Sequence, residues 1–231
     1  MSDLNILSGG AAHGLVASLA AAFKARTGFE IKGEFGAVGG MADKLRNGVA
    51  ADMIILTAAL VATLAEQGLV VPSSISDVGM VETALAVRSR DSKVLAKNSD
   101  DLRNALLAAD AIFVPDTKAS TAGLHVAKVL QELGIADEVA GRLKVYPNGA
   151  TAMRELAASD AKRPIGCTQS TEIVSTEGVE LSGVLPPGCE LATTYTAAIT
   201  TRATNAGAAQ ALIDLLTSTE AGDAHRRVGF L

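Results

Sequence analysis

Short apolar runs alternate with longer stretches of helical periodicity along the chain. Residues 4–8 and 52–57 form apolar runs typical of buried strands, and residues 30–35 alternate between polar and apolar positions. Between the runs at 4–8 and 30–35, residues 10–26 place Leu15, Leu19 and Phe23 on one helical face. Thr27-Gly28 predicts where that helix stops. Strand, helix and strand in this order predict a parallel sheet covered by helices.

A second series of the same kind follows. Residues 80–88 and 190–201 predict two long strands that bracket it, which indicates one α/β lobe inserted into another. We therefore predict lobe I over residues 1–82 and 196–231, lobe II over residues 83–195, and a hinge where the chain crosses. In such proteins the ligand binds in the cleft between lobes and the lobes close on it. The other predicted elements are strands at 111–115, 143–146 and 164–168 and helices at 41–46, 58–67, 99–108, 121–133, 150–158 and 205–228, the last as one helix or two joined near Ser218.

Composition supports a packed α/β protein. The chain has 231 residues, of which 48% are hydrophobic and only 3% aromatic, so Ala, Val, Leu and Ile supply most of the core. Disorder is excluded by this apolar content. The mean hydropathy of +0.30 is high. No apolar run approaches the roughly 18–20 residues that a membrane span needs, so we expect no membrane insertion.

Charge and cysteine content exclude other classes. The net charge is −5 and the basic residues are scattered, so no face for a phosphate backbone is indicated and we expect no nucleic-acid partner. Cys167 and Cys189 show no metal-ligand spacing and are predicted to be small buried side chains. A disulfide between them is an alternative only in an oxidising compartment. The N-terminal residues lack the pattern of a secretory leader. This predicts a cytoplasmic protein, or a periplasmic one from which a leader has been removed.

Small and hydroxyl-bearing residues recur where strands give way to helices. Ligands of open parallel sheets bind at the carboxyl ends of strands, where glycine admits close backbone approach and helix N-termini favour anions. Any one of these loops alone is better explained as a helix cap or a turn. Their recurrence favours a shared anion site. The loops are Ser8-Gly9-Gly10-Ala11, Ala37-Val38-Gly39-Gly40, residues 117–123, residues 147–150 and Thr168-Gln169-Ser170-Thr171.

Cofactor and nucleophile motifs are missing from the sequence. Ser8-Gly9-Gly10 lacks the GxGxxG spacing, and no GxxxxGK[ST] segment occurs. No Ser/His/Asp or Cys/His arrangement can be defined. We therefore expect no cofactor and no metal.

The sequence resembles the molybdate-binding-protein-like branch of the type 2 periplasmic solute-binding proteins. The resemblance runs almost end to end, and its most distinctive part is the Gly-x-x-Ala-Asp segment that ends at Asp52. Other segments that carry it are Ser8-Gly9-Gly10, Gly36-Ala37-Val38-Gly39-Gly40, Glu66-Gln67-Gly68-Leu69-Val70, Leu133-Gly134-Ile135-Ala136 and residues 211–218.

This resemblance implies two α/β lobes that close on a small anion, either an oxyanion or a carboxylate. It also leaves open an ABC permease as the protein's partner. Where molybdate binders of this kind present a serine in the second loop, this chain has Ala37-Val38-Gly39. The implied ligand-binding residues are Ser8, Gly9, Gly10, Val38, Gly39, Ser120, Thr121, Asn148, Gln169 and Ser170.

The same branch includes aconitate isomerase-like members, so the resemblance leaves an enzyme open. A cofactor-independent isomerase or tautomerase of a small polycarboxylate needs a base beside the substrate and an acid to return the proton. His13, in the first turn of the first helix, and Lys118, in a lobe II loop, are the candidate catalytic residues in that case. His13 is equally well a solvent-facing helix residue, and a lysine in the position of Lys118 is more often an exposed turn residue. Our leading hypothesis is a solute-binding protein for a small anion, and the isomerase is the alternative.

Overall fold

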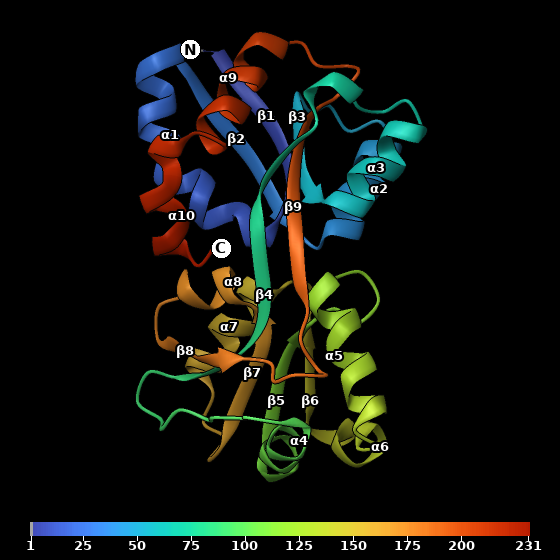
Figure 1. Cartoon of the computed structure of the whole chain (residues 1–231), viewed down its shortest axis with the longest axis vertical. Helices are drawn as coiled ribbons and strands as arrows, with labels where there is room; N and C mark the ends of the chain where they lie inside the picture. Colours follow the sequence, from blue (N-terminus) through green and yellow to red (C-terminus); the bar gives the residue numbers. More distant parts are fainter. Residues whose placement is uncertain (1) are drawn as a thin grey trace. The chain divides into compact units, whose positions relative to one another are not determined.

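The computed structural model describes residues 2–231, which form two compact units. The first unit comprises the residues up to Val81 together with Thr193–Leu231, and the second comprises Glu82–Ala192. The chain passes from one unit to the other within strand β4 (Ser76–Arg88) and again at the start of strand β9 (Ala192–Ile199). Each unit is an α/β structure built on its own core (Figure 1).

The first unit has the strand order β2-β1-β3-β9. Strands β1 (Ser2–Gly9), β2 (Phe29–Gly36) and β3 (Met53–Thr57) run parallel, while β9 is antiparallel to β3. Helices α1 (His13–Thr27), α9 (Ala206–Leu216) and α10 (Gly222–Val228) gather on one side of this sheet, and α2 (Val38–Arg46) and α3 (Ala58–Glu66) lie on the other (Figure 1). Short 3-10 turns occupy Gly10–Ala12, Pro72–Ser74 and Thr219–Ala221.

The second unit has the order β4-β7-β5-β6, with β8 (Val179–Val184) pairing β4 on its own. Strands β5 (Ala111–Pro115), β6 (Leu143–Tyr146) and β7 (Pro164–Gln169) are parallel, and β4 is antiparallel to β7. The helices are α4 (Ser99–Ala108), α5 (Thr121–Glu132), α6 (Ala136–Val139), α7 (Gly149–Ala158) and α8 (Ser170–Val174), with a 3-10 turn at Ala140–Arg142.

The two faces of the second sheet carry different helices. A Cβ added at Gly166 would press on the Met153 and Leu156 side chains of α7, so this face of β7 belongs to α7. Cys167, one residue on, lies in the cluster that contains Val126 and Val129 of α5. Because side chains alternate along a strand, Thr168 faces α7 and Gln169 faces α5. This alternation positions the site described below.

The alternation of strands and helices predicted from the sequence is confirmed, and most of the predicted bounds hold within a few residues. Three short elements were missed: α6, α8 and β8. Strand β8 escaped prediction because it is short, contains Gly183 and pairs with β4 through a register shift. The C-terminal segment takes the second of its two predicted forms, two helices joined by a turn at Thr219–Ala221.

Asp52, from the distinctive segment, has a structural role. Its buried carboxylate accepts hydrogen bonds from the backbone amides of Asn5, Thr204 and Asn205 at 2.8–2.9 Å. Burial alone would raise the pKa of this carboxyl, but the hydrogen bonds from Asn5, Asn205 and Thr204 together lower it. Asp52 thus ties the starts of β3 and α9 to β1.

Candidate functional site

In the first unit, the carboxyl ends of β1, β2 and β3 lie side by side. Register pairs Gly9 with Gly36 and Ser8 with Ile55, so the three strands end at one edge. A Cβ on Gly9 would come within 2.8 Å of both Val38 and Tyr195, so only glycine allows this approach of β1 to α2 and β9. The structure therefore brings together the predicted residues of this unit, Ser8, Gly9, Gly10, Val38 and Gly39.

Donors at this first edge are mainly backbone amides. Helix α2 begins at Val38, and the first N–H groups of a helix have no partner within it. Ser8 is fully buried, and its hydroxyl donates to the Gly9 carbonyl at 3.0 Å. Thr193 lies two residues beyond the pairing of Tyr195 with Thr57, at the same edge, and its buried hydroxyl has no hydrogen-bond partner among residues 2–231.

His13 lies at the edge of the first unit, as its position in the sequence suggested. It is exposed, and its ring centroid is 4.6 Å from that of Phe35, which is next to the last residue of β2. The imidazole is thus placed over the carboxyl end of β2, open to solvent. A role for His13 in chemistry stays a prediction.

In the second unit, Gln169 is the most unusual of the predicted residues. It ends β7 with only 3% of its surface exposed, yet neither atom of its side-chain amide has a hydrogen-bond partner in the described part of the chain. Register pairs it with Thr83 of β4, whose buried hydroxyl is likewise without a partner there. Directly paired residues of antiparallel strands point to the same face, so the two side chains share the α5 face.

Helix α5 begins on this same face. Ser120 is its buried N-cap residue and makes no side-chain capping bond, while Thr121 opens the helix. The preceding loop is held by Asp116, whose Oδ1 accepts the backbone amides of Lys118 at 2.7 Å and Ala119 at 3.0 Å. The Lys118 side chain is exposed. Ser120, Gln169 and Thr83 are thus polar groups at the carboxyl edge of one sheet face.

The start of α7, also predicted to bind ligand, is already occupied by a side chain of the protein. The buried Glu172 carboxylate accepts the Thr168 hydroxyl at 2.6 Å and the backbone amides of Gly149, Ala150 and Gln169. A Cβ at Gly149 would overlap this carboxylate, so glycine is required there. Burial raises the pKa of Glu172 more than these four hydrogen bonds lower it.

Asn148 is the N-cap of the same helix. Its Oδ1 accepts the Thr151 amide at 2.8 Å, the capping role that the sequence left open beside ligand binding. Ser170 opens the short helix α8 and is buried. Beside it, the buried Thr171 hydroxyl has no hydrogen-bond partner among the residues that the structure describes.

The two cysteines and the two remaining histidines have structural roles. Both cysteines are buried and free, and burial raises the pKa of the Cys167 thiol to about 12. His125 contacts the Cys189 carbonyl through Nε2 at 2.8 Å, and His225 contacts the Leu216 carbonyl in the same way. No group of three metal-ligating side chains occurs within residues 2–231, and no helix in that range has the length and apolar character to cross a membrane.

Sequence reasoning missed Thr83 and Glu172, whereas Thr171 lies in one of the predicted ligand loops. Thr83 lies in an apolar run of β4, and a hydroxyl inside such a run was the signal that could have marked it. Glu172 gave no such signal, because its burial against α7 arises only from the tertiary fold.

A family comparison covers nearly the whole molecule. Residues 4–231 match the model of the bacterial extracellular solute-binding proteins. The chain belongs to this family. The prediction of a solute-binding protein and of its α/β fold class is thereby confirmed.

Relatives of known structure and function agree with this assignment. An aconitate isomerase from a Pseudomonas species is 25% identical over 235 residues, which cover 97% of this chain and 86% of that protein. The periplasmic molybdate-binding protein of Azotobacter vinelandii has a TM-score of 0.81 at 17% identity, with 99% of this chain and 98% of that chain covered. The sulfate-binding protein SubI of Mycobacterium tuberculosis H37Rv has a TM-score of 0.77 at 18% identity, with 100% and 86% covered. At these identities the structural likeness establishes the fold alone.

Proposed function

We propose that the protein binds a small oxyanion or carboxylate through neutral donors at the carboxyl ends of its strands. The observation that carries this proposal is the buried Gln169 amide beside Thr83, because groups of this kind are paired in nearly all proteins. An anion bound there would accept hydrogen bonds from the amide nitrogen and from the threonine hydroxyl.

The electrostatics of the second unit favour an anion without a nearby cation. The N-terminus of α5, at Ser120 and Thr121, carries about half a positive charge by the general behaviour of helices. The start of α7 already holds a carboxylate, that of Glu172, on backbone amides and one hydroxyl. The chain therefore holds one carboxyl group, whose pKa is raised by burial, on neutral donors, and we propose that the neutral groups of Ser120, Thr121, Gln169 and Ser170 hold the ligand.

The first unit offers donors of the same type. Ser8, Gly9 and Gly10 and the start of α2 at Val38 and Gly39 place amides and a hydroxyl at its carboxyl edge. The structural neighbours include a molybdate-binding and a sulfate-binding protein, which supports an inorganic oxyanion as the first class to test. Delivery to an ABC permease in the periplasm belongs to the same proposal.

Thermal unfolding with added anions tests the proposal. Molybdate, tungstate, sulfate, citrate and both aconitate isomers would be compared with chloride at equal ionic strength. A ligand at 100 times its Kd stabilises the folded state by about 2.7 kcal/mol, so a true ligand gives a clear upward shift in Tm. Titration calorimetry on the wild type and on Gln169→Met would follow. If none of these anions raises Tm above the chloride control, the proposal is wrong.

The isomerase is the second candidate, favoured by the aconitate isomerase relative and by the solvent-open His13 at the first carboxyl edge. In this reaction His13 would take a proton from the allylic carbon of a bound polycarboxylate, the double bond would shift, and an acid such as Lys118 would return a proton to the far carbon. Incubation with each aconitate isomer in deuterated solvent would reveal exchange at that carbon. Tight binding without exchange excludes the isomerase, and full turnover by His13→Gln removes His13 from it.

A further inference from the structure

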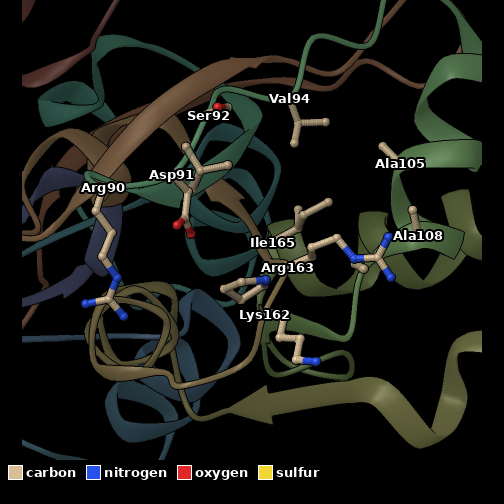
Figure 2. Close-up of a pocket in the computed structure, with 12 residues that line it drawn as sticks. Arg90, Asp91, Ser92, Val94, Ala105, Ala108, Lys162, Arg163 and Ile165 are labelled. Atoms are coloured by element: carbon tan, nitrogen blue, oxygen red, sulfur yellow. The ribbon is translucent and has the colours of Figure 1, made fainter.

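The second unit contains a cavity of about 490 Å³ away from the polar groups described above. It lies where β5 and β7 begin, beside Ile165 and Ala109, and where β4 ends, beside Val87. Because β4 is antiparallel to β7, these ends share one edge, and it is the edge opposite to Gln169. Figure 2 shows Val94, Ala105 and Ile165 around the open space.

The wall of this cavity is mainly apolar and continuous with the core. Val87, Ala109 and Ile165 are buried beneath it, and Val94 and Ala105 pack against the cluster of the second unit. Small side chains on α4, Ala105 and Ala108, leave the space that larger ones would fill. The volume falls in the range of about 300–1,000 Å³ that small-molecule sites occupy.

Positive charge surrounds the opening. Arg90, Lys162 and Arg163 line it, and Asp91 is the one acidic residue that does. The Arg90 guanidinium donates to the Ser159 carbonyl at 3.2 Å. The Asp91 carboxylate is already held by the buried Arg88 guanidinium at 2.6 and 3.2 Å. Arg163 has a long contact of 3.4 Å with Asp110, whereas Lys162 is exposed and has no ion-pair partner in the described chain. This local excess of cations contrasts with the net charge of −5 for the whole chain.

We propose that this cavity is a second ligand site, for a small carboxylate with an apolar tail of about six to eight carbons. The tail would contact Val87, Val94 and Ile165, and the carboxylate would lie near Lys162. An inorganic dianion fits less well because it would leave the apolar wall without a partner. A cation is disfavoured by the three basic residues. The site is independent of the anion site proposed for the carboxyl edge.

Octanoate is the probe for the test. Its binding is measured by titration calorimetry and by the changes it causes in the backbone amide chemical shifts of the whole chain. Octylamine has the same tail with the opposite charge, and acetate has the charge without the tail. We expect saturable octanoate binding, shifts at Ala105, Ala108 and Ile165, and at least tenfold weaker binding of both comparison compounds. Equal binding of octylamine, or octanoate shifts elsewhere in the chain, would overturn the proposal.

Three variants make the test specific. Ala105→Phe fills the cavity from α4 and is expected to abolish octanoate binding. Lys162→Glu is expected to weaken it about tenfold, while Lys144→Glu, an exposed lysine on β6 in the same unit, leaves it unchanged. Gln169→Met is expected to bind octanoate normally, so failure of the anion site does not affect this result. Thermal unfolding of each variant confirms folding. Octanoate binding unaltered in both Ala105→Phe and Lys162→Glu would refute the site.

Discussion

Replacing Gln169 with methionine separates a ligand-binding role from a structural one. The side chain is 3% exposed and its amide has no hydrogen-bond partner within residues 2–231, so folding removes that amide from water without compensation. An unpaired buried polar group costs about 1–3 kcal/mol. Methionine has similar length and shape and no such group. We therefore expect Gln169→Met to raise the free energy of unfolding of the ligand-free protein by about 1 kcal/mol, and to abolish anion binding.

The matched control lies one residue earlier. Thr168 is equally buried, but its hydroxyl donates to the Glu172 carboxylate at 2.6 Å. Thr168→Val keeps the shape, removes this bond and should lower the free energy of unfolding by about 1–3 kcal/mol, because a buried oxygen of Glu172 loses a hydrogen-bond donor. Thr171→Val removes a hydroxyl that has no hydrogen-bond partner in the described part of the chain, so it should not lower the free energy of unfolding. Urea unfolding of the three variants without ligand supplies the numbers. If Gln169→Met destabilises as much as Thr168→Val, the amide is paired in the free protein and the argument for a ligand fails.

Three further predictions concern the buried carboxylates and a glycine. Asp52→Asn should lower the free energy of unfolding by about 1–3 kcal/mol at neutral pH. Because the pKa of Asp52 is lowered in the folded state, this difference from the wild type should shrink as pH falls below about 4. Urea unfolding at several pH values that shows a constant difference would contradict the prediction. Glu172→Gln should gain stability relative to the wild type as pH rises above about 4, because the raised pKa makes the charged form costly in the folded state; a gap that moves the other way would refute this. Gly149→Ala should destabilise by about 1–3 kcal/mol through overlap with Glu172, and unchanged thermal unfolding would exclude that packing.

Much of the fold was predictable because periodicity reports local structure. The apolar runs at β1, β3 and β5 and the helical face of α1 are properties of consecutive residues, and they placed these elements within a few positions. Short elements with mixed patterns, such as β8 and α8, depend on tertiary contacts and were missed. The lobe boundaries and the predicted hinge stay predictions.

The candidate site was predictable only in outline. Strand-to-helix loops marked Ser120, Gln169 and the glycines of the first edge, because parallel strands place their carboxyl ends together. The sequence could not distinguish a free helix start from one occupied by another part of the chain. Glu172, far from Gly149 in sequence, fills the start of α7, and this pairing follows only from the packing of α7 against β7.

The side-chain NH₂ resonances of Gln169 provide the most direct test of the account. They can be assigned as the pair that disappears from the amide spectrum in Gln169→Met, and then followed while molybdate, sulfate or an aconitate is added to the wild type. The account predicts that they shift in proportion to site occupancy and reach a plateau at the calorimetric stoichiometry. Saturable anion binding that leaves these two resonances unmoved would contradict it.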